Sequence, residues 1–255
     1  MILTIDIGNS NIVLGCIQDS QILFEARMAT DRTKTADQYC AELKTMLELF
    51  EVSPASIEGS IVSSVVPMVQ QVVVQAVERL TRKLCLTVGP GLKTGLNIKI
   101  DNPAQAGSDL IVGAVAAIER YGAPMCLVDL GTATTISVID RDGVFRGGSI
   151  APGVMLSLNA LSGGTAQLPA ISLERPRKVI GTNTVDSMRS GLLLGSAAML
   201  DGMVERIEAE LGYPTRVIAT GGLAKAIVPL CKREMIVNDN LLLEGLELLY
   251  RKNVR

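Results

Sequence analysis

Residues 2–17 have the sequence ILTIDIGNSNIVLGCI, and this stretch decides which fold we expect. An apolar run ends at Asp6, a polar turn with Gly8 follows, and a second apolar run returns at Ile12, which predicts a β-hairpin. Glycine permits a positive φ and a close ligand, so the turn's N–H groups could bind a phosphate. Asp6 could hold hydrated Mg²⁺ against it. An ordinary tight turn without a ligand is the alternative.

A second copy of the pattern lies in the other half of the chain. Residues 125–140, MCLVDLGTATTISVID, contain an apolar strand that ends at Asp129, followed by Gly131 and several threonines. Two hairpins whose turns could each bind phosphate predict a duplicated α/β domain that closes on one nucleotide. We expect lobes at 1–117 and 118–255, each a mixed sheet with helices.

A third glycine element, ATGGLA, occupies residues 219–224 after an apolar run. A strand, paired glycines and a helix start are typical of a site where the backbone approaches a ligand closely. We expect Gly221 and Gly222 to contact the ribose or base of the nucleotide.

Length and composition limit the possible classes of protein. The chain has 255 residues, which is enough for two lobes of about 120 residues each. It is 48% hydrophobic and 20% charged, with 24 Lys and Arg against 26 Asp and Glu, and it has no Trp. This composition predicts a globular protein without a nucleic-acid surface. No apolar segment is long enough for a membrane helix, and Asp6 argues against a signal peptide, so we expect neither a membrane partner nor export.

The cysteines and the absence of histidine restrict the chemistry. The five cysteines are scattered, without a CxxC pair, which predicts free thiols in a reducing cytoplasm. Without histidine, a general base must be a carboxylate or, as a weaker alternative, Lys, Tyr or Cys.

The other segments alternate between strand and helix patterns. In the first half we expect strands at 21–28, 60–66 and 84–88 and helices at 35–50, 67–80 and 109–121. In the second half we expect strands at 144–150 and 215–219 and helices at 154–161, within 183–211, from 222, and at 240–252.

Asp109 is the candidate general base. It ends the polar GSD triplet of residues 107–109, at the start of a predicted helix. The helix dipole would keep this carboxylate ionised while it accepts a proton from a substrate hydroxyl. The alternative is that Asp109 or Ser108 is only an N-cap.

The segment 183–211 is apolar or small on every side between Leu192 and Leu200. It is either a deeply buried core helix or the seam of a homodimer, because small residues let helices approach closely. The small residues are Gly191, Gly195, Ser196 and Ala197.

Several motifs together resemble one family over essentially the whole chain. They are DIGNSNIVLG (6–15), DNPAQAGSD (101–109), DLGTATT (129–135), GGSIAPG (147–153), LP (168–169), GTNT (181–184) and ATGG (219–222). The chain resembles the type III pantothenate kinases, which are members of the actin, hexokinase and Hsp70-like ATPase superfamily. The resemblance implies two ribonuclease H-like lobes, with a cleft between them, and ATP-dependent phosphorylation of pantothenate, the first step toward coenzyme A.

The resemblance also implies roles for single residues. Asp109 would be the general base, Thr132 would contact ATP, Asp129 would help to bind a potassium or ammonium ion, and Thr184 would reach pantothenate. The residues implied to hold the ATP phosphates and Mg²⁺ are Asp6, Ile7, Gly8, Asn9, Ser10, Asn11, Ile12 and Val13. The substrate-binding segment would comprise Ile100, Gly107, Ser108, Asp109 and Leu110. In this family the pantothenate pocket lies at a homodimer interface.

Two positions depart from the family's pattern. The family commonly has Tyr where this chain has Ile100, and Arg where it has Leu110. Loss of an Arg contact to the pantothenate carboxylate would cost about 1.5 to 3 kcal/mol. Lys99 could replace that cation, or the substrate could be another small hydroxyl compound. A nucleotide-binding regulator with little catalysis is a further alternative.

Overall fold

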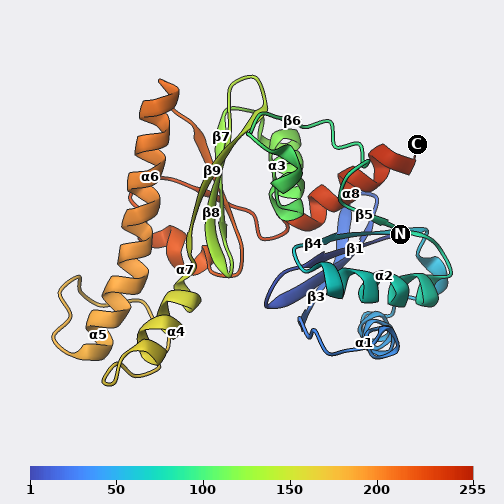
Figure 1. Ribbon diagram of the computed structural model, residues 1–255, viewed down its shortest axis with the longest axis horizontal. Coiled ribbons are helices and arrows are strands. Elements are labelled where there is room, and N and C mark those ends of the chain that lie inside the picture. Colours follow the sequence, from blue (N-terminus) through green and yellow to red (C-terminus); the bar gives the residue numbers. More distant parts are fainter. Residues whose placement is uncertain (255) are drawn as a thin grey trace. The chain divides into compact units, whose positions relative to one another are not determined.

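The protein is described by a computed structural model that covers residues 1–254. Its contacts divide it into two compact units (Figure 1). The first unit contains residues 1–96, 101–120 and 240–254, and the second contains 97–100 and 121–239. Both units combine a mixed sheet with helices, which confirms the α/β prediction. The lobe boundaries at 117 and 118 stay a prediction.

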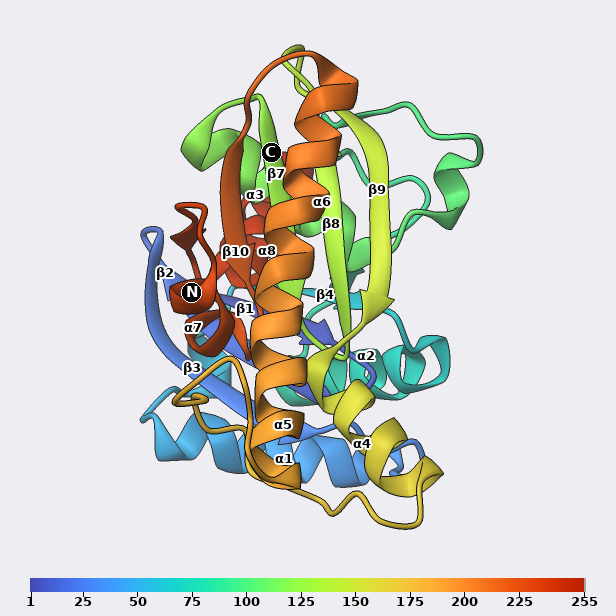
Figure 2. The ribbon, with the colours of Figure 1, turned by 90° about the vertical axis from the view of Figure 1, so that its left-hand side faces the viewer.

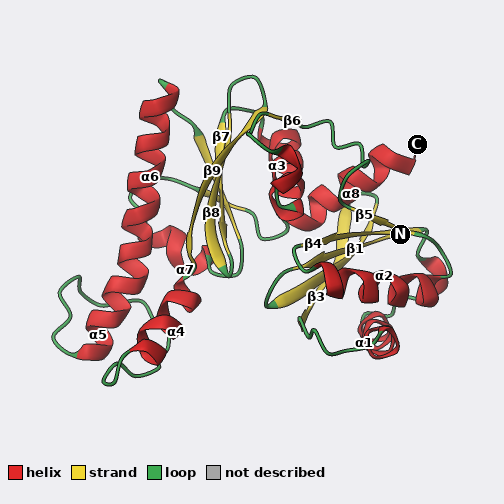
Figure 3. Cartoon of the chain, in the orientation of Figure 1, coloured by secondary structure: helices red, strands yellow, loops and turns green. Residues whose placement is uncertain are grey.

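The first unit contains a five-stranded sheet with the order β3-β2-β1-β4-β5. Strands are drawn in yellow in Figure 3. The predicted hairpin and third strand form an antiparallel meander, and two further strands run parallel to β1. The strands are β1 (Ile2–Ile7), β2 (Asn11–Gln18), β3 (Gln21–Ala29), β4 (Gly59–Ser64) and β5 (Cys85–Thr87).

Helices cover this sheet because both of its faces are apolar. On one face, α1 (Ala36–Leu49) and α2 (Pro67–Thr81) bury residues such as Leu43 and Val73 against Leu3 and Ile5. A capping box of Thr35 and Gln38 fixes where α1 begins. On the other side, a smaller cluster joins Ile61 and Val88 to two more helices, α3 (Ser108–Tyr121) and α8 (Leu241–Val254). The two short helical turns are η1 (Pro54–Ser56) and η2 (Pro103–Gln105).

The second unit contains a six-stranded sheet with the order β11-β10-β7-β8-β9-β6. The predicted second hairpin continues into another antiparallel meander, while β10 runs parallel to β7. The strands are β6 (Asn97–Ile98), β7 (Met125–Leu130), β8 (Ala133–Ile139), β9 (Val144–Pro152), β10 (Arg216–Thr220) and β11 (Ile236–Val237). The sequence analysis missed β6 and β11, which have two residues each and therefore no periodicity.

The helical segment after residue 183 is continuous but not uniformly α-helical. It consists of α5 (Thr184–Arg189), a π-helical stretch η3 (Ser190–Leu194) and α6 (Gly195–Leu211), and α6 runs along one face of the sheet (Figure 2). Leu193, Ala197 and Leu200 are buried in the core, whereas Gly191 and Gly195 are exposed. The core explanation therefore accounts for one side of the helix only. The remaining helices are α4 (Val154–Gly164), α7 (Ala224–Ile227) and η4 (Val228–Leu230).

The C-terminal helix α8 packs in the first unit, although the sequence analysis assigned it to the second lobe. Leu243 would meet any side chain at Gly15 of β2, and Tyr250 fills the space beside Gly59 of β4. Glycines in two strands thus accommodate one helix. Chain order alone could not show this, because an amphipathic pattern does not identify the surface that it covers. No helix within residues 1–254 is long and apolar enough to cross a membrane.

Candidate active site

The β1–β2 turn is held by hydrogen bonds from two directions. Within the turn, the Gly8 N–H donates to the Asn11 carbonyl at 2.9 Å. From the end of β3, Thr30 donates its N–H to the Ser10 carbonyl at 3.0 Å and its hydroxyl to the Gly8 carbonyl at 2.7 Å. The φ of Gly8 is not in the left-handed region, so the turn does not use the positive φ that glycine permits; a Cβ there would lie 3.1 Å from the Asn11 oxygen. Glycine is therefore favoured by space rather than by backbone conformation.

Asp6 lies one residue before the end of β1, between Val13 of β2 and Ser63 of β4, and is 8% exposed. The Ser63 hydroxyl donates to the Ser108 hydroxyl oxygen at 3.0 Å. Ser108 in turn donates to the Ser64 carbonyl at 2.8 Å and accepts from the Ser64 N–H at 3.2 Å. These bonds fasten the start of α3 to the strand next to Asp6. The structure thus brings Asp6 and the GSD triplet together within the first unit.

Asp109 lies in the first turn of α3. The Gly107 carbonyl accepts the first helical hydrogen bond, from the Ile111 N–H at 3.2 Å, so Gly107 is the N-cap. The N-cap alternative for Ser108 or Asp109 is therefore wrong. Asp109 Oδ1 accepts from the Leu110 N–H at 2.9 Å, and a side chain at position 107 would clash with the same oxygen. Burial raises the pKa of Asp109, while the Leu110 N–H acts in the opposite direction.

The β7–β8 turn is shorter than the first by one residue. Strand pairing ends at Ile7 and Ile12 in the first hairpin but at Leu130 and Thr134 in the second. The Thr132 carbonyl accepts from the Gly153 N–H at 3.1 Å. A Cβ at Gly153 would overlap the backbone of this turn. The last glycine of the GGSIAPG motif therefore packs against the turn and donates a hydrogen bond to it.

The paired-glycine element packs against the same hairpin. Thr220 pairs with Asp129 in the parallel register of β10 and β7, and the Leu223 N–H donates to the Leu130 carbonyl at 3.2 Å. Gly221 has a φ of +94°, and a Cβ there would lie 2.7 Å from Leu130 backbone atoms and would overlap the Asp129 carboxylate. The close approach at Gly221 is thus made by the protein's own backbone. Gly222 follows it and is exposed.

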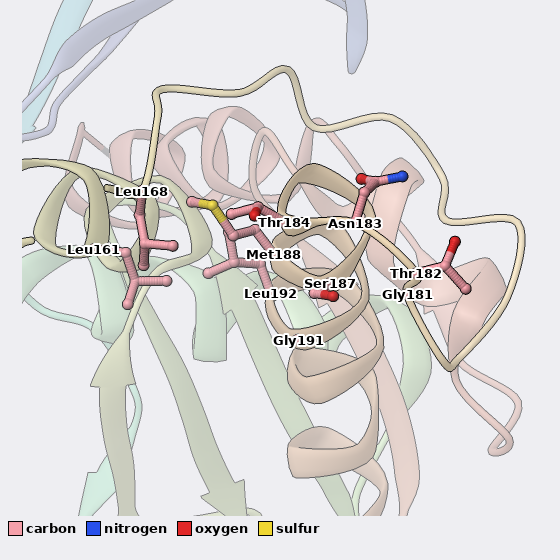
Figure 4. A pocket seen from close by; sticks show the side chains of 10 residues that line it. All are labelled: Leu161, Leu168, Gly181, Thr182, Asn183, Thr184, Ser187, Met188, Gly191 and Leu192. Atoms are coloured by element: carbon pink, nitrogen blue, oxygen red, sulfur yellow. The ribbon is translucent and has the colours of Figure 1, made fainter. Parts of the chain in front are cut away.

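Thr184 lines a pocket of about 710 Å³ in the second unit (Figure 4). Such a volume suits a small organic ligand. One side of the lining is apolar, with Leu161, Leu168, Met188 and Leu192, and the GTNT residues contribute polar groups. The Asn183 side chain accepts from the Asp186 N–H at 2.9 Å and so fixes the start of α5. A Cβ at Gly181 would overlap the backbone of that first turn. The GTNT motif is therefore built into the wall of this pocket.

The predicted site residues fall into two groups. Asp6, its turn and the segment Gly107–Leu110 belong to the first unit. Ile100 belongs to the second unit, where it lies beside Gly147, and the adjacent Lys99 N–H donates to the Phe145 carbonyl at 2.9 Å. The other predicted residues of the second unit are Asp129, Thr132, Thr184, Gly221 and Gly222.

Two residues that build the first-unit site were missed by the sequence analysis. Ser63 is a polar residue at the end of a buried strand, which was an available signal. Thr30 had no local signal, because its partners lie about 20 residues earlier in the chain.

No group of three or more Cys, Asp or Glu side chains in residues 1–254 could hold a metal by itself. Asp6 and Asp129 each offer one carboxylate. Single carboxylates suit Mg²⁺, which keeps several waters and uses substrate phosphates as ligands. A cation here would therefore depend on the nucleotide.

Two mixed-sheet units, each with an Asp-x-Gly hairpin, define the actin-like fold class. Component A of the (R)-2-hydroxyglutaryl-CoA dehydratase of Acidaminococcus fermentans matches with a TM-score of 0.60 at 15% identity, covering 100% of this chain and 99% of that one. The inorganic polyphosphate/ATP-glucomannokinase of Arthrobacter sp. strain KM matches with a TM-score of 0.53 at 14% identity, covering 98% of each chain. At these identities the likeness concerns the fold alone.

Sequence similarity is closer and identifies the family. The family model of type III pantothenate kinase matches residues 2–206. The type III pantothenate kinase of Halalkalibacterium halodurans is 44% identical over 254 residues, covering 100% of both chains. That of Exiguobacterium sibiricum is 45% identical over 253 residues, covering 99% of this chain and all of the relative. This chain therefore belongs to the type III pantothenate kinase family.

Proposed function

We propose that this protein transfers the terminal phosphoryl group of ATP to the hydroxyl of pantothenate, the first step of coenzyme A synthesis, with Asp109 as the general base. Family membership supports the reaction. The observation that carries the role of Asp109 is the hydrogen-bonded link from its helix, through Ser108, to the strand beside Asp6.

In this proposal the phosphates of ATP bind the backbone N–H groups of the β1–β2 turn. The turn suits this role because Thr30 fixes two of its carbonyls from outside. Asp6 would hold Mg²⁺ through water, and a bound Mg²⁺ supplies charge neutralisation for the transferring group. The residues of the turn need only bind and orient the polyphosphate, because phosphoryl transfer depends mainly on position and charge.

Asp109 would accept the proton of the attacking hydroxyl. Its half-buried position and raised pKa make it a stronger base than an ordinary aspartate, while the Leu110 N–H orients one oxygen. The carboxylate would then accept the substrate proton. Proton acceptance in this geometry is typically worth about 10² to 10⁴ in rate.

The second unit carries the remaining residues to which we assign ligands. We assign Thr132, Gly221 and Gly222 to contacts with ATP, and Asp129 to an activating potassium or ammonium ion. Asp129 suits a cation because it carries a carboxylate beside Gly131 and Gly221, two residues that have no side chain of their own. Thr184 would bind pantothenate in the pocket beside α5.

We further propose that the protein is a cytoplasmic homodimer. The exposed Gly191 and Gly195 have open space beside them, so a second helix could approach closely. Val179, whose carbonyl accepts from the Ser190 hydroxyl, and the adjacent Ile180 are also exposed apolar residues. Free thiols at all five cysteines are consistent with a reducing compartment.

Coupled ADP release with pantothenate tests the proposal, with potassium, with ammonium and with neither. We expect turnover with pantothenate and stimulation by one of the two ions. Absence of ADP release under all three conditions, despite measurable ATP binding, would overturn the proposed reaction and favour a nucleotide-binding regulator.

A second candidate is a kinase for another small hydroxyl compound. Ile100 and Leu110 are half-buried apolar residues where the family commonly has Tyr and Arg. A panel of pantothenate, sugars and polyols in the same assay separates the two candidates. Faster turnover of a compound without a carboxylate would favour the second.

A further inference from the structure

The loop that connects β3 to α1, residues 30–35, is hydrogen-bonded to the β1–β2 turn. Thr30 makes the two hydrogen bonds to that turn described above. The Tyr39 hydroxyl accepts from the Asp31 N–H at 3.0 Å and donates to the Asp31 carbonyl at 2.7 Å, and Tyr39 is 1% exposed. The Asp31 carboxylate accepts from the Thr33 N–H at 2.8 Å. Bonds on both sides of Arg32 therefore hold its backbone in place.

The side chain of Arg32 is exposed and lies beside the turn. Its Nη2 is 3.4 Å from the Asn9 side-chain oxygen, which is a long hydrogen bond. Within residues 1–254 its guanidinium has no carboxylate partner, and the neighbouring Asp31 carboxylate is engaged by Thr33. A positive charge thus lies at the edge of a turn whose own side chains, at positions 8–11, are all uncharged.

We propose that Arg32 binds the terminal phosphate of ATP at the β1–β2 turn. The inference rests on the proposed function, because it requires that this turn is the phosphate site. A guanidinium presents N–H donors in a planar fork that matches phosphate oxygens, and such charge-assisted bonds are stronger than the Asn9 contact that they would replace. The fastened loop lowers the entropy lost on binding, since the backbone of Arg32 is already fixed.

A contact to the terminal phosphate predicts discrimination between ATP and ADP. Calorimetric titration of Mg–ATP and of Mg–ADP should be carried out on the wild type, Arg32→Gln, Arg32→Lys and the control Lys44→Gln. Lys44 is exposed on α1 and pairs with Glu48 of the same helix, so its loss changes the charge of the same unit without touching the turn. We expect Arg32→Gln to weaken ATP binding roughly tenfold or more and ADP binding less than about twofold. The ATP affinity of Arg32→Lys should lie between that of the wild type and that of Arg32→Gln.

Two results would overturn the inference alone. One is an Arg32→Gln variant with the wild-type ratio of ATP to ADP affinity. The other is an equal loss of affinity for ATP and for ADP in both Arg32→Gln and Arg32→Lys, which would mean that Arg32 only supports the turn. A wild-type protein that binds no ATP would instead overturn the proposed function, and the inference with it. Thermal unfolding of each variant shows whether it has folded.

Discussion

The β1–β2 turn and the β7–β8 turn begin with the same Asp-x-Gly pattern but are supported in different ways. Hydrogen-bonding side chains surround the first turn, with Thr30 on its carbonyls and Arg32 beside Asn9. The second is supported by backbone groups, through Gly153 below it and Gly221 against Asp129. Substitutions around the first turn should therefore change ligand binding and catalysis, whereas substitutions at the second should first change stability.

Asp109→Asn is the strongest test of the catalytic part assigned to the first unit. We expect turnover to fall by roughly 10² to 10⁴, with ATP affinity nearly unchanged, because the amide cannot accept the substrate proton. Steady-state kinetics and ATP titration measure both quantities. In the wild type, turnover should fall as the pH falls through the raised pKa of Asp109, and this limb should be absent from the variant.

The expected effect of Asp109→Asn on stability has the opposite sign to its effect on turnover. Because the folded-state pKa of Asp109 lies above its unfolded value, its stabilising contribution is complete below the unfolded pKa and is lost as the pH rises through the folded pKa. At neutral pH, Asp109→Asn should therefore unfold at the same or a higher temperature than the wild type. Asp142→Asn, in an exposed turn of the second unit, is the control for turnover. Unchanged turnover in Asp109→Asn would remove it as the base.

Gly221→Ala tests the backbone packing of the second turn. The new Cβ would meet Leu130 backbone atoms at 2.7 Å, and the φ of +94° strains any L side chain. We expect the free energy of unfolding to fall by about 2 to 5 kcal/mol, from left-handed strain and overpacking together. Urea denaturation measures the loss.

Gly212→Ala is the matched control for this substitution. Gly212 ends α6 with a φ of +77°, and nothing lies within 4 Å of its added Cβ. It should cost only the strain, about 1 to 2 kcal/mol. Equal losses in the two variants would show that the packing of Gly221 on the β7–β8 turn has no energetic weight.

The sequence predicts those parts of the fold and site that depend on local pattern. Both hairpins, and the helix start at Asp109, follow from apolar runs, glycine and polar residues close together in the chain. The link from Ser63 to Ser108 and the packing of α8 on β4 join residues 45 or more positions apart, and no local pattern encodes which surfaces meet. Gly221 shows a related limit. A close backbone approach was predictable there, but not that Leu130 would be the neighbour.

Ser108→Ala tests whether the link between α3 and β4 positions Asp109. The variant loses the hydroxyl that bonds to Ser63 and Ser64, so we expect the free energy of unfolding to fall by about 1 to 2 kcal/mol. Turnover should fall about tenfold, because small displacements of a catalytic group are costly, while ATP affinity stays unchanged. Denaturation, kinetics and ATP titration measure these effects.

Two further variants separate positioning from general stability. Ser108→Thr keeps the hydroxyl and should recover most of the turnover. Thr45→Ala removes an exposed hydroxyl that donates to the Ala41 carbonyl within α1, so it should change neither quantity. A Ser108→Ala protein that is destabilised but fully active would show that the link holds the fold together without positioning Asp109.

Thr184→Ala should have the smallest effect, and it tests the ligand assigned to the second unit. Removal of one hydroxyl from the pocket wall should raise the KM for pantothenate by roughly three- to tenfold, the value of one neutral hydrogen bond. The ATP affinity and the stability should not change, because Thr184 is exposed and Asn183 caps α5. Thr87→Ala, on an exposed strand position of the first unit, is the control. A change in ATP affinity without a change in the KM for pantothenate would show that the pocket binds the nucleotide and not pantothenate. The second unit would then contribute to ATP binding alone.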